Sequence, residues 1–314
     1  MAKLDKLAFW RKPLPDEWRS PTFWKDTAWA YIYLAPALII LAIFTFYPFF
    51  STFRLSLYRV SFTDFPGRYV GLAHFRYLLG DRYFWRALVN TLIIVGTSVP
   101  ITLILALMVA NLLNKPLRLR TFARTSFFLS YITPMVAVIM VWQLMYNESF
   151  GLINYLIGLF GIDRIAWLNS PKYALPAVII LSIWRYVGYQ AIILLAGMQG
   201  IDQMYYEAAR IDGASGFQVW RKITVPLLTP QIFFLLIISM IGSFKMFTEV
   251  YVLFTGTSGP LKAAETLVYY IMRQGFFFTP HYGRAAAASI VLFVIIFLVT
   301  LLQMQIAKRR VHYQ

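Results

Sequence analysis

Residues Tyr206–Pro230 read YEAARIDGASGFQVWRKITVPLLTP and form a polar interruption between two long apolar runs. Asp202 is placed to cap a short helix over about residues 203–211, with its side chain accepting from the first free backbone amides. Gly213 then supplies the left-handed residue that commonly ends a helix. This segment is therefore predicted to fold as a short helix and a turn between two apolar elements.

A second short helix is predicted directly after that turn. Ser215 and Gln218 have the spacing of a capping box, and Pro226 is expected to stop the helix. Neither helix reaches the roughly 12 to 15 residues that an isolated helix needs in water. We therefore expect a partner protein to dock against them, although a solvated loop that merely joins two spans is the simpler interpretation of a loop of this length.

The composition of the chain determines its class. Of its 314 residues, 60% are hydrophobic and only 13% are charged, which is far from the composition of a soluble protein. The chain has no cysteine, which excludes disulfides and thiolate metal sites, and its 3 histidines are scattered. The formal charge of +16 fits Lys and Arg flanking membrane spans near anionic lipid, so no nucleic-acid partner is expected.

Apolar runs of about 20 residues or more, each long enough to cross a bilayer core, divide the chain. Six such runs are predicted, at Trp29–Phe50, Val89–Leu113, Phe127–Tyr146, Tyr173–Met198, Gln231–Phe254 and Ala285–Ile306. An even number of spans places both termini on one side of the membrane. Lys and Arg are more numerous on that side, so the termini and the 206–230 loop are predicted to be cytoplasmic.

The polar loop resembles the EAA loop of ABC importer permeases, the membrane subunits that are served by an extracytoplasmic binding protein. The shared pattern is Glu-Ala-Ala, three residues, Gly, nine residues, then Ile-x-(Leu/Val)-Pro, with Val225 where Leu is usual. The matching positions are Glu207, Ala208, Ala209, Asp212, Gly213, Ala214, Ile223, Val225 and Pro226. In that family the loop forms a coupling helix, so the resemblance implies that Glu207–Ala209 and Asp212–Ala214 contact an ATPase subunit.

Further motifs are similar to the carbohydrate-uptake branch of that family, the maltose and glycerol-3-phosphate type. They are Asn90-Thr91-Leu92, Ala110–Asn114, Gly151–Asn154, Ala166-Trp167-Leu168, Leu195-Ala196-Gly197 and Glu265-Thr266-Leu267 with Tyr270. The resemblance covers about residues 29–307. It departs at Asp202, where the branch often has proline, and at Phe254–Pro260, where a tighter Thr-Gly-Gly-Gly-Pro is common.

Hydropathy, charge bias and the resemblance together give the expected organisation of the whole chain. The expected fold is an all-α polytopic membrane protein with six transmembrane helices and cytoplasmic coupling helices between spans 4 and 5. An interfacial segment, residues 1–28, precedes the permease domain, residues 29–307, which contains the coupling loop at 199–230. A basic tail, residues 308–314, follows in the cytoplasm. The segment 1–28 lacks the apolar core of a signal peptide.

Three charged residues fall inside the predicted spans. Arg185 lies midway along the fourth span, where a charge costs at least about 2.5 to 3.5 kcal/mol and should face a cavity or the bundle interior. Lys245 and Glu249 are four residues apart in the fifth span and can neutralise each other on one helical face. An ion pair that fixes helix packing is as good an interpretation of this pair as a role in transport.

A translocation path is the alternative interpretation of these spans. Aromatic faces with hydrogen-bonding side chains suit the apolar faces and hydroxyl edges of sugar rings, whereas an anionic cargo would favour cations such as Arg185. Tyrosine and phenylalanine in a membrane helix are, however, commonly packing residues. The candidate path residues are Arg185, Tyr186, Tyr189, Gln190, Ser239, Ser243, Phe247 and Glu249.

The chain contains no phosphate-binding loop of the G-x-x-x-x-G-K-[ST] type, so we expect ATP to be hydrolysed by another subunit. The chain itself would then be no enzyme and bind no cofactor, with ATP and Mg²⁺ held by the ATPase. The resemblance implies two ATPase subunits, a second homologous permease and a soluble binding protein. Alternatives are import of glycerol-3-phosphate or another small polar solute, and a self-sufficient secondary transporter. A membrane-embedded enzyme is a further alternative, but the sequence shows no catalytic constellation for it.

Overall fold

The computed structural model describes residues 21–61, 64–116, 118–277 and 280–310, in two compact units, Met1–Arg54 and Leu55–Gln314. The first unit contains α1 (Pro21–Leu41), the π-helical turn η3 (Ala42–Phe46) and most of α2 (Tyr47–Ser56). Helix α1 therefore begins before Trp29, inside the predicted interfacial segment. Residues 1–20 of that segment and 311–314 of the predicted tail lie outside the described residues.

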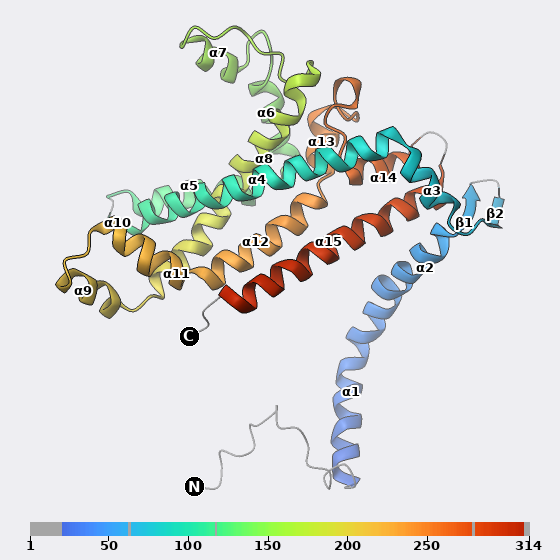
Figure 1. The fold of residues 1–314 in the computed structure, drawn as a ribbon, viewed down its shortest axis with the longest axis horizontal. Helices are drawn as coiled ribbons and strands as arrows, with labels where there is room; N and C mark the ends of the chain where they lie inside the picture. The colour runs from blue at the N-terminus through green and yellow to red at the C-terminus, as the bar shows by residue number, and fades with distance from the viewer. Residues whose placement is uncertain (1–20, 62–63, 117, 278–279, 311–314) are drawn as a thin grey trace. The chain divides into compact units, whose positions relative to one another are not determined.

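The second unit begins with a β-hairpin that the sequence did not predict. Strands β1 (Tyr58–Ser61) and β2 (Asp64–Tyr69) pair antiparallel, with Arg59 opposite Arg68. Helix α3 (Ala73–Gly80) follows and leads into the first long helix of this unit (Figure 1).

Three long helices form the framework of the second unit. They are α4 (Arg82–Asn114), α8 (Pro171–Gln199) and α15 (Tyr282–Arg310). Helix α4 begins at Arg82 because the Asp81 carboxylate accepts a 2.9 Å hydrogen bond from the Tyr83 amide and caps it. Helices α4 and α8 pack along each other, and α12 (Thr229–Phe244) lies against both α4 and α15 (Figure 1).

Two of the predicted spans are broken rather than continuous. The predicted span Phe127–Tyr146 is divided into α5 (Arg120–Ile132) and α6 (Met135–Met145), which are bent by 99° at a break. Thr133 is extended, at φ −58° and ψ 136°, because the following Pro134 disfavours helical geometry at the residue before it. The predicted span Gln231–Phe254 is likewise divided, into α12 and α13 (Thr248–Leu253).

Shorter elements connect these helices. They are α7 (Leu152–Gly158), α9 (Gln203–Ile211), α10 (Gly216–Val219), the π-helical η4 (Trp220–Thr224), α11 (Val225–Leu227), the 3-10 turn η5 (Pro260–Lys262) and α14 (Leu267–Phe276). Pro226 does not stop the second loop helix, which continues through η4 and α11 and bends by 64° into α12.

Within the described residues, four helices are long and apolar enough to cross a membrane, and six spans result if each bent pair counts as one. Apolar side chains of the second unit gather in three clusters, one between α6, α8 and α13, one between α4, α14 and α15, and one between α4, α8 and α12. The polar side chains that interrupt these clusters define the candidate site.

Candidate functional site

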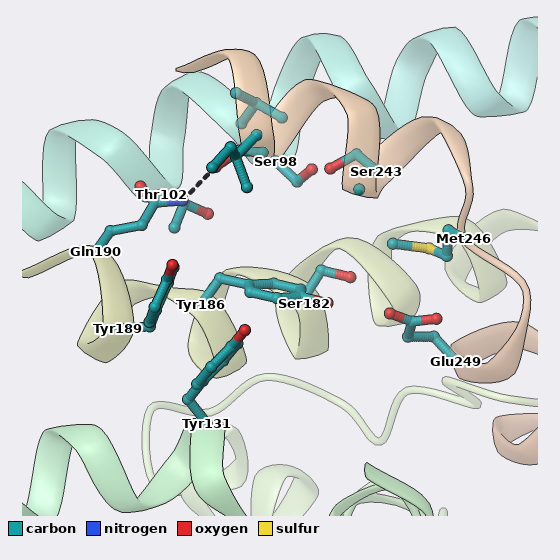
Figure 2. Close-up of a pocket in the computed structure, with 14 residues that line it drawn as sticks. Ser98, Thr102, Tyr131, Ser182, Tyr186, Tyr189, Gln190, Ser243, Met246 and Glu249 are labelled. Carbon is teal, nitrogen blue, oxygen red and sulfur yellow. Dashed lines mark hydrogen bonds between the residues drawn. The ribbon is translucent and has the colours of Figure 1, made fainter. Parts of the chain in front are cut away.

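A cavity of about 200 Å³ lies between α4, α5, α8 and α12 (Figure 2). One side is aromatic, the other carries hydroxyl groups, and a carboxyl group closes one end. Its lining residues are Ser98, Val99, Thr102, Tyr131, Ser182, Tyr186, Tyr189, Gln190, Ile238, Ser239, Gly242, Ser243, Met246 and Glu249.

Three tyrosines form the aromatic side of the cavity. Tyr131 projects from the last turn of α5 and stacks on Tyr189 of α8, with ring centroids 4.3 Å apart and an angle of 20° between the rings. Tyr186, one turn earlier on α8, lies with its centroid 6.0 Å from that of Tyr131. Contact between the helices fixes these rings before any ligand arrives.

The opposite side presents hydroxyl and amide groups. Gln190 Nε2 donates a 2.9 Å hydrogen bond to Ser239 Oγ, which joins α8 to α12 across the cavity. Gln190 Oε1 is buried and has no hydrogen-bond partner among the described atoms. The Ser98 hydroxyl on this side, and the Ser182 hydroxyl beside Tyr186 (Figure 2), donate to the carbonyls of Ile94 and Val178 in their own helices, which leaves their oxygens able to accept. These groups can accept hydrogen bonds from a hydroxylated ligand, and the Ser239 hydroxyl, which accepts from Gln190, can donate one.

Glu249 lies at the end of the cavity and is 6% exposed. The predicted Lys245–Glu249 helical pair is wrong, because α12 ends at Phe244 and α13 begins at Thr248. Phe247 between them has φ −138° and ψ −54°, which removes the four-residue helical spacing. Lys245 is exposed, and the ion pair found in the described part of the chain involves other residues.

Arg185 and Phe247, both predicted path residues, do not line this cavity. The Arg185 guanidinium is 3.4 Å from each of the Ser130, Tyr131 and Thr133 carbonyl oxygens, where α5 ends. Arg185 therefore donates hydrogen bonds to backbone carbonyls that have no helical N–H donor at the break between α5 and α6. Phe247 packs against Tyr251, with centroids 5.2 Å apart.

The structure thus gathers Tyr186, Tyr189, Gln190, Ser239, Ser243 and Glu249 around one cavity and leaves the other two predicted residues out of it. The sequence analysis missed several lining residues. Ser182 lies one helical turn from Tyr186, and Ser98 and Thr102 are four residues apart on one face of α4, so helical spacing alone was a usable signal. Tyr131 had no such signal, because its position depends on the break after α5.

The 199–230 loop has the local geometry that its sequence predicts. Asp202 caps α9 through a 2.9 Å bond from the Met204 amide, and Gly213 has φ +72°. Ser215 and Gln218 make both bonds of the capping box. These local predictions are confirmed.

The small and charged residues of this loop differ in exposure. Glu207, Ala208, Asp212 and Gly213 are exposed and Ala214 is half-buried. Ala209 is only 7% exposed, so its side chain faces the chain itself rather than a partner. Large apolar side chains, Met204, Ile211 and Phe217, lie exposed beside these residues.

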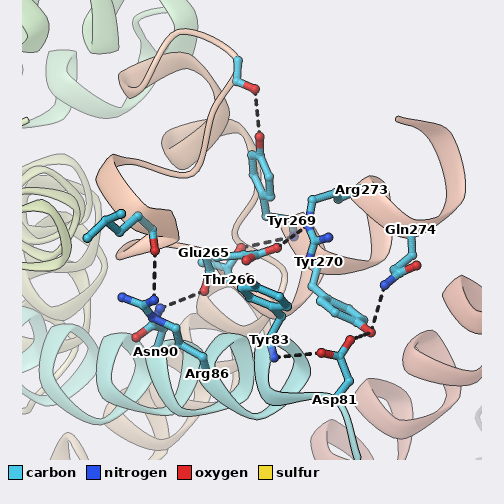
Figure 3. A network of polar contacts seen from close by, with 12 residues as sticks. Asp81, Tyr83, Arg86, Asn90, Glu265, Thr266, Tyr269, Tyr270, Arg273 and Gln274 are labelled. Carbon is cyan, nitrogen blue, oxygen red and sulfur yellow. Dashed lines mark hydrogen bonds and ion pairs between the residues drawn. The ribbon is translucent and has the colours of Figure 1, made fainter. Parts of the chain in front are cut away.

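A polar network joins two segments that are far apart in the sequence (Figure 3). The Asn90 amide donates 3.0 Å bonds to the carbonyls of Ala263 and Glu265, and Thr91 Oγ1 accepts from the Leu267 amide at 2.8 Å. Thus the Asn90-Thr91-Leu92 and Glu265-Thr266-Leu267 motifs hold each other in place. This contact was not predicted from either motif.

Charged side chains complete the network. Arg273 Nε is 2.7 Å from Glu265 Oε1, and Tyr270 donates a 2.7 Å bond to the Asp81 carboxylate that caps α4. Burial raises the pKa of Glu265 above its ordinary value, and the Arg273 guanidinium opposes that rise. This network anchors the segment before α14 to the beginning of α4. In the described ranges, no group of three His, Asp or Glu residues is arranged to hold a metal ion.

Comparisons with known proteins agree over most of the chain. Residues 78–312 match the family described as binding-protein-dependent transport system inner membrane component. The lactose transport system permease protein LacF of Rhizobium radiobacter is 35% identical, over 89% of this chain and 94% of its own. The sn-glycerol-3-phosphate transport system permease protein UgpA of Agrobacterium fabrum is 32% identical, over 90% and 96%.

A solved structure has a similar fold. It is a bacterial alginate ABC transporter in complex with an alginate pentasaccharide-bound periplasmic protein. One of its chains superposes with a TM-score of 0.76 at 27% identity, and the match covers 91% of this chain and 96% of that one.

Proposed function

The chain belongs to the family of binding-protein-dependent transport system inner membrane components, and we propose that it is the permease subunit of an ATP-driven importer of a neutral sugar or oligosaccharide. As a member of this family it is an inner-membrane transport component and not an enzyme. The observation that carries the proposed cargo is the cavity with stacked tyrosines on one side and hydroxyl groups on the other.

Chemistry favours a sugar in this cavity. A sugar ring has apolar C–H faces that fit against Tyr131 and Tyr189, and hydroxyl edges that fit the unpaired Gln190 Oε1 and the serines opposite. The lactose permease relative and the structural neighbour of the alginate system support a saccharide cargo of some kind.

The charge of the cavity lining distinguishes a neutral sugar from two anionic candidate cargoes. Glycerol-3-phosphate, named for one relative, and an acidic polysaccharide, named for the structural neighbour, both carry anionic groups. The charged side chain that lines the cavity is the carboxylic acid of Glu249, and no lysine or arginine is among the lining residues. The two terminal nitrogens of Arg185 donate to backbone carbonyls at the end of α5, outside the lining of the cavity. An anion in this cavity would therefore lack a cationic partner, and a secondary transporter is disfavoured by the family.

We propose the following membrane arrangement and partners. The four long helices, the bent pair α5 and α6, and α12 with α13 make six spans, with both termini and the 199–230 loop in the cytoplasm. Two ATPase subunits hold ATP and Mg²⁺, and one docks on the loop through Glu207, Ala208, Asp212, Gly213 and Ala214. Ala209 contributes by its small size. A second homologous permease completes the path, and a soluble binding protein delivers the cargo from outside.

The proposed mechanism is alternating access. Closure of the ATPase dimer moves the 199–230 loop, and the loop moves α8 and α12, which border the cavity. Residues 29–307 form the permease domain in this proposal, and residues 1–28 and 308–314 flank it at the cytoplasmic surface of the membrane.

The experiment that tests the cargo is uptake and binding-protein-stimulated ATP hydrolysis in a reconstituted complex. The panel contains neutral oligosaccharides, uronic acid oligosaccharides and glycerol-3-phosphate. We expect a neutral saccharide to stimulate, Tyr189→Leu to abolish most uptake, and the matched Tyr189→Phe to retain it because the ring remains. Stimulation by glycerol-3-phosphate or a uronic acid oligosaccharide alone would refute the neutral-sugar assignment.

Docking of the ATPase is tested separately. The double variant Glu207→Arg with Gly213→Trp is expected to abolish stimulated hydrolysis, whereas Glu148→Arg, an exposed acid in another loop, should leave it intact. Normal stimulation in the double variant, or failure of any ATPase to co-purify, would contradict the coupling role.

A further inference from the structure

A second cavity, of about 470 Å³, lies between the β1–β2 hairpin, α3 and the beginning of α15. Its lining has two arginines and two histidines and, among the described side chains, no acidic residue. The lining residues are Arg59, Val60, Ala73, His74, Tyr77, His281, Gly283 and Arg284. Nothing in the proposed transport path uses this cavity, which we term the basic hollow.

The basic groups of the hollow are held in place. The Arg284 guanidinium carbon lies 3.8 Å from the centroid of the Tyr77 ring, an arrangement that fixes the planar group. His74 is 8% exposed and its Nε2 donates a 3.1 Å bond to the Tyr58 carbonyl. Gly283 permits this close approach, because a methyl group on it would overlap both His74 Nε2 and the Tyr58 carbonyl oxygen.

Electrostatics in the hollow are one-sided. Burial is the main cause that lowers the pKa of His74, the Tyr58 carbonyl opposes it, and Arg284, Arg59 and His281 lower the pKa further. The pKa of His281 is also lowered, by burial and by Arg284. The charged groups that act on these histidines are thus basic ones, which repel one another until an anion enters.

The position of the hollow indicates the source of that anion. The candidate span Tyr282–Ala307 begins beside His281 and Arg284, and the candidate span Arg82–Asn114 begins just after α3. The hollow therefore lies at the end of two membrane spans, at the depth where lipid headgroups lie. Tyr77 lines the hollow, and Tyr58 and Tyr69 pack against each other in the hairpin that borders it, as expected of the aromatic belt at a membrane interface.

We propose that the basic hollow binds the phosphate group of an anionic phospholipid, with Arg59 and Arg284 as its charge partners and the His281 imidazole as a hydrogen-bonding partner. Planar guanidinium groups suit phosphate oxygens because they donate two parallel hydrogen bonds. This site is separate from the proposed sugar cavity and would hold the hairpin at the lipid headgroups, beside the beginning of α15.

Native mass spectrometry of the complex in mild detergent tests the proposal. The probes are phosphatidylglycerol, a diglucosyl diacylglycerol with the same acyl chains but no phosphate, and inorganic phosphate. The test variant is Arg59→Gln with Arg284→Gln. The matched control is Arg68→Gln with Arg76→Gln, which removes two exposed arginines from the hairpin and α3 without touching the hollow.

We expect the native chain to retain phosphatidylglycerol in preference to the phosphate-free lipid. Because the test variant removes both charged hydrogen-bond donors to the phosphate, it should bind phosphatidylglycerol at least about tenfold more weakly. The control should remain within about twofold, and equal unfolding temperatures for both variants exclude misfolding. Equal retention of phosphatidylglycerol by the native chain and the test variant would overturn the proposal.

Two further outcomes would also overturn it. If inorganic phosphate stabilises the native chain while phosphatidylglycerol does not, the site serves a soluble anion. If the test variant keeps its lipid but loses stimulation by the binding protein, the hollow meets an acidic protein surface instead. Lipid retention is measured without transport, so this result stands apart from the test of the proposed cargo.

Discussion

Replacing Arg185 with Met tests whether this buried charge holds a broken span together or meets the cargo. Arg185 is 7% exposed, and its guanidinium lies 3.4 Å from three carbonyl oxygens at the end of α5, beside the 99° bend. Methionine fills much of the same volume but donates no hydrogen bond. The variant would therefore leave three carbonyls without a donor in an apolar surrounding.

The structure sets the size of the expected effect. A buried polar group without its partner costs about 1 to 3 kcal/mol, and the 3.4 Å distances place each of these bonds at the weak end of that range. Three such carbonyls give a loss of about 3 kcal/mol. By the scaling for domains of 150 to 250 residues, this lowers the unfolding temperature by roughly 6 to 12 °C.

Thermal unfolding of the purified complex, followed by tryptophan fluorescence, measures this loss. Arg185→Lys should fall between the native chain and Arg185→Met, because an ammonium group keeps the charge but lacks the planar fork. Arg164→Met, an exposed arginine in another loop, should change the stability by less than about 0.5 kcal/mol. An unchanged unfolding temperature for Arg185→Met, together with a raised KM for uptake, would show that Arg185 contacts the cargo and would refute the structural role.

Three further predictions follow from single contacts. Gly213→Val should strain the loop by about 1 to 2 kcal/mol and reduce stimulated ATP hydrolysis, because the residue has φ +72° and open space around it, whereas Gly213→Asn should be tolerated. Asn90→Ala, which removes two bonds to loop carbonyls, should cost about 1 to 3 kcal/mol in chemical unfolding, and the exposed Asn111→Ala on the same helix should cost almost nothing. The pKa of His74 is lowered in the folded chain, so the unfolded chain binds more protons just below pH 6.5. The stability of the folded chain should therefore rise with pH up to about 6.5. His74→Gln should flatten that rise in unfolding temperatures measured over a series of pH values.

Features with a local cause were predictable from the sequence. The caps at Asp202 and Ser215 and the left-handed Gly213 depend on residues within one helical turn of each other, and all three have the expected geometry. The long apolar helices were also predictable, because bilayer thickness and hydropathy set their lengths. Their ends were less so, since α4 begins at the cap provided by Asp81, ahead of its apolar run.

Features that depend on tertiary packing were not predictable. Pro100 lies inside the unbroken helix α4, whereas the chain bends sharply at Thr133 and Pro134, so proline alone does not decide where a span breaks. At the break before Pro134, Arg185 of another helix donates hydrogen bonds to the carbonyls that have lost their helical donors. The sequence placed Arg185 correctly inside a span but could not identify its partners, and the same limit applied to Glu249.

The loop and the cavity are connected by two helices that meet each other. Helix α8 ends at Gln199 and α12 begins at Thr229, so these helices lead directly into and out of the 199–230 loop. They are joined at the cavity by the 2.9 Å bond from Gln190 to Ser239. Each of these residues lies nine or ten positions from the loop end of its helix, or roughly 15 Å at 1.5 Å per residue.

Gln190 and Ser239 lie at nearly equal distances from the loop. A movement of the loop along the helix axes therefore shifts both sides of the cavity together and preserves the Gln190–Ser239 bond. A movement that spreads the loop ends separates them and breaks it. If coupling opens the cavity by spreading, then replacing Gln190 and Ser239 by two cysteines and crosslinking them should abolish stimulated ATP hydrolysis, and reduction should restore it. Activity that survives the crosslink would favour movement of the two helices as one body.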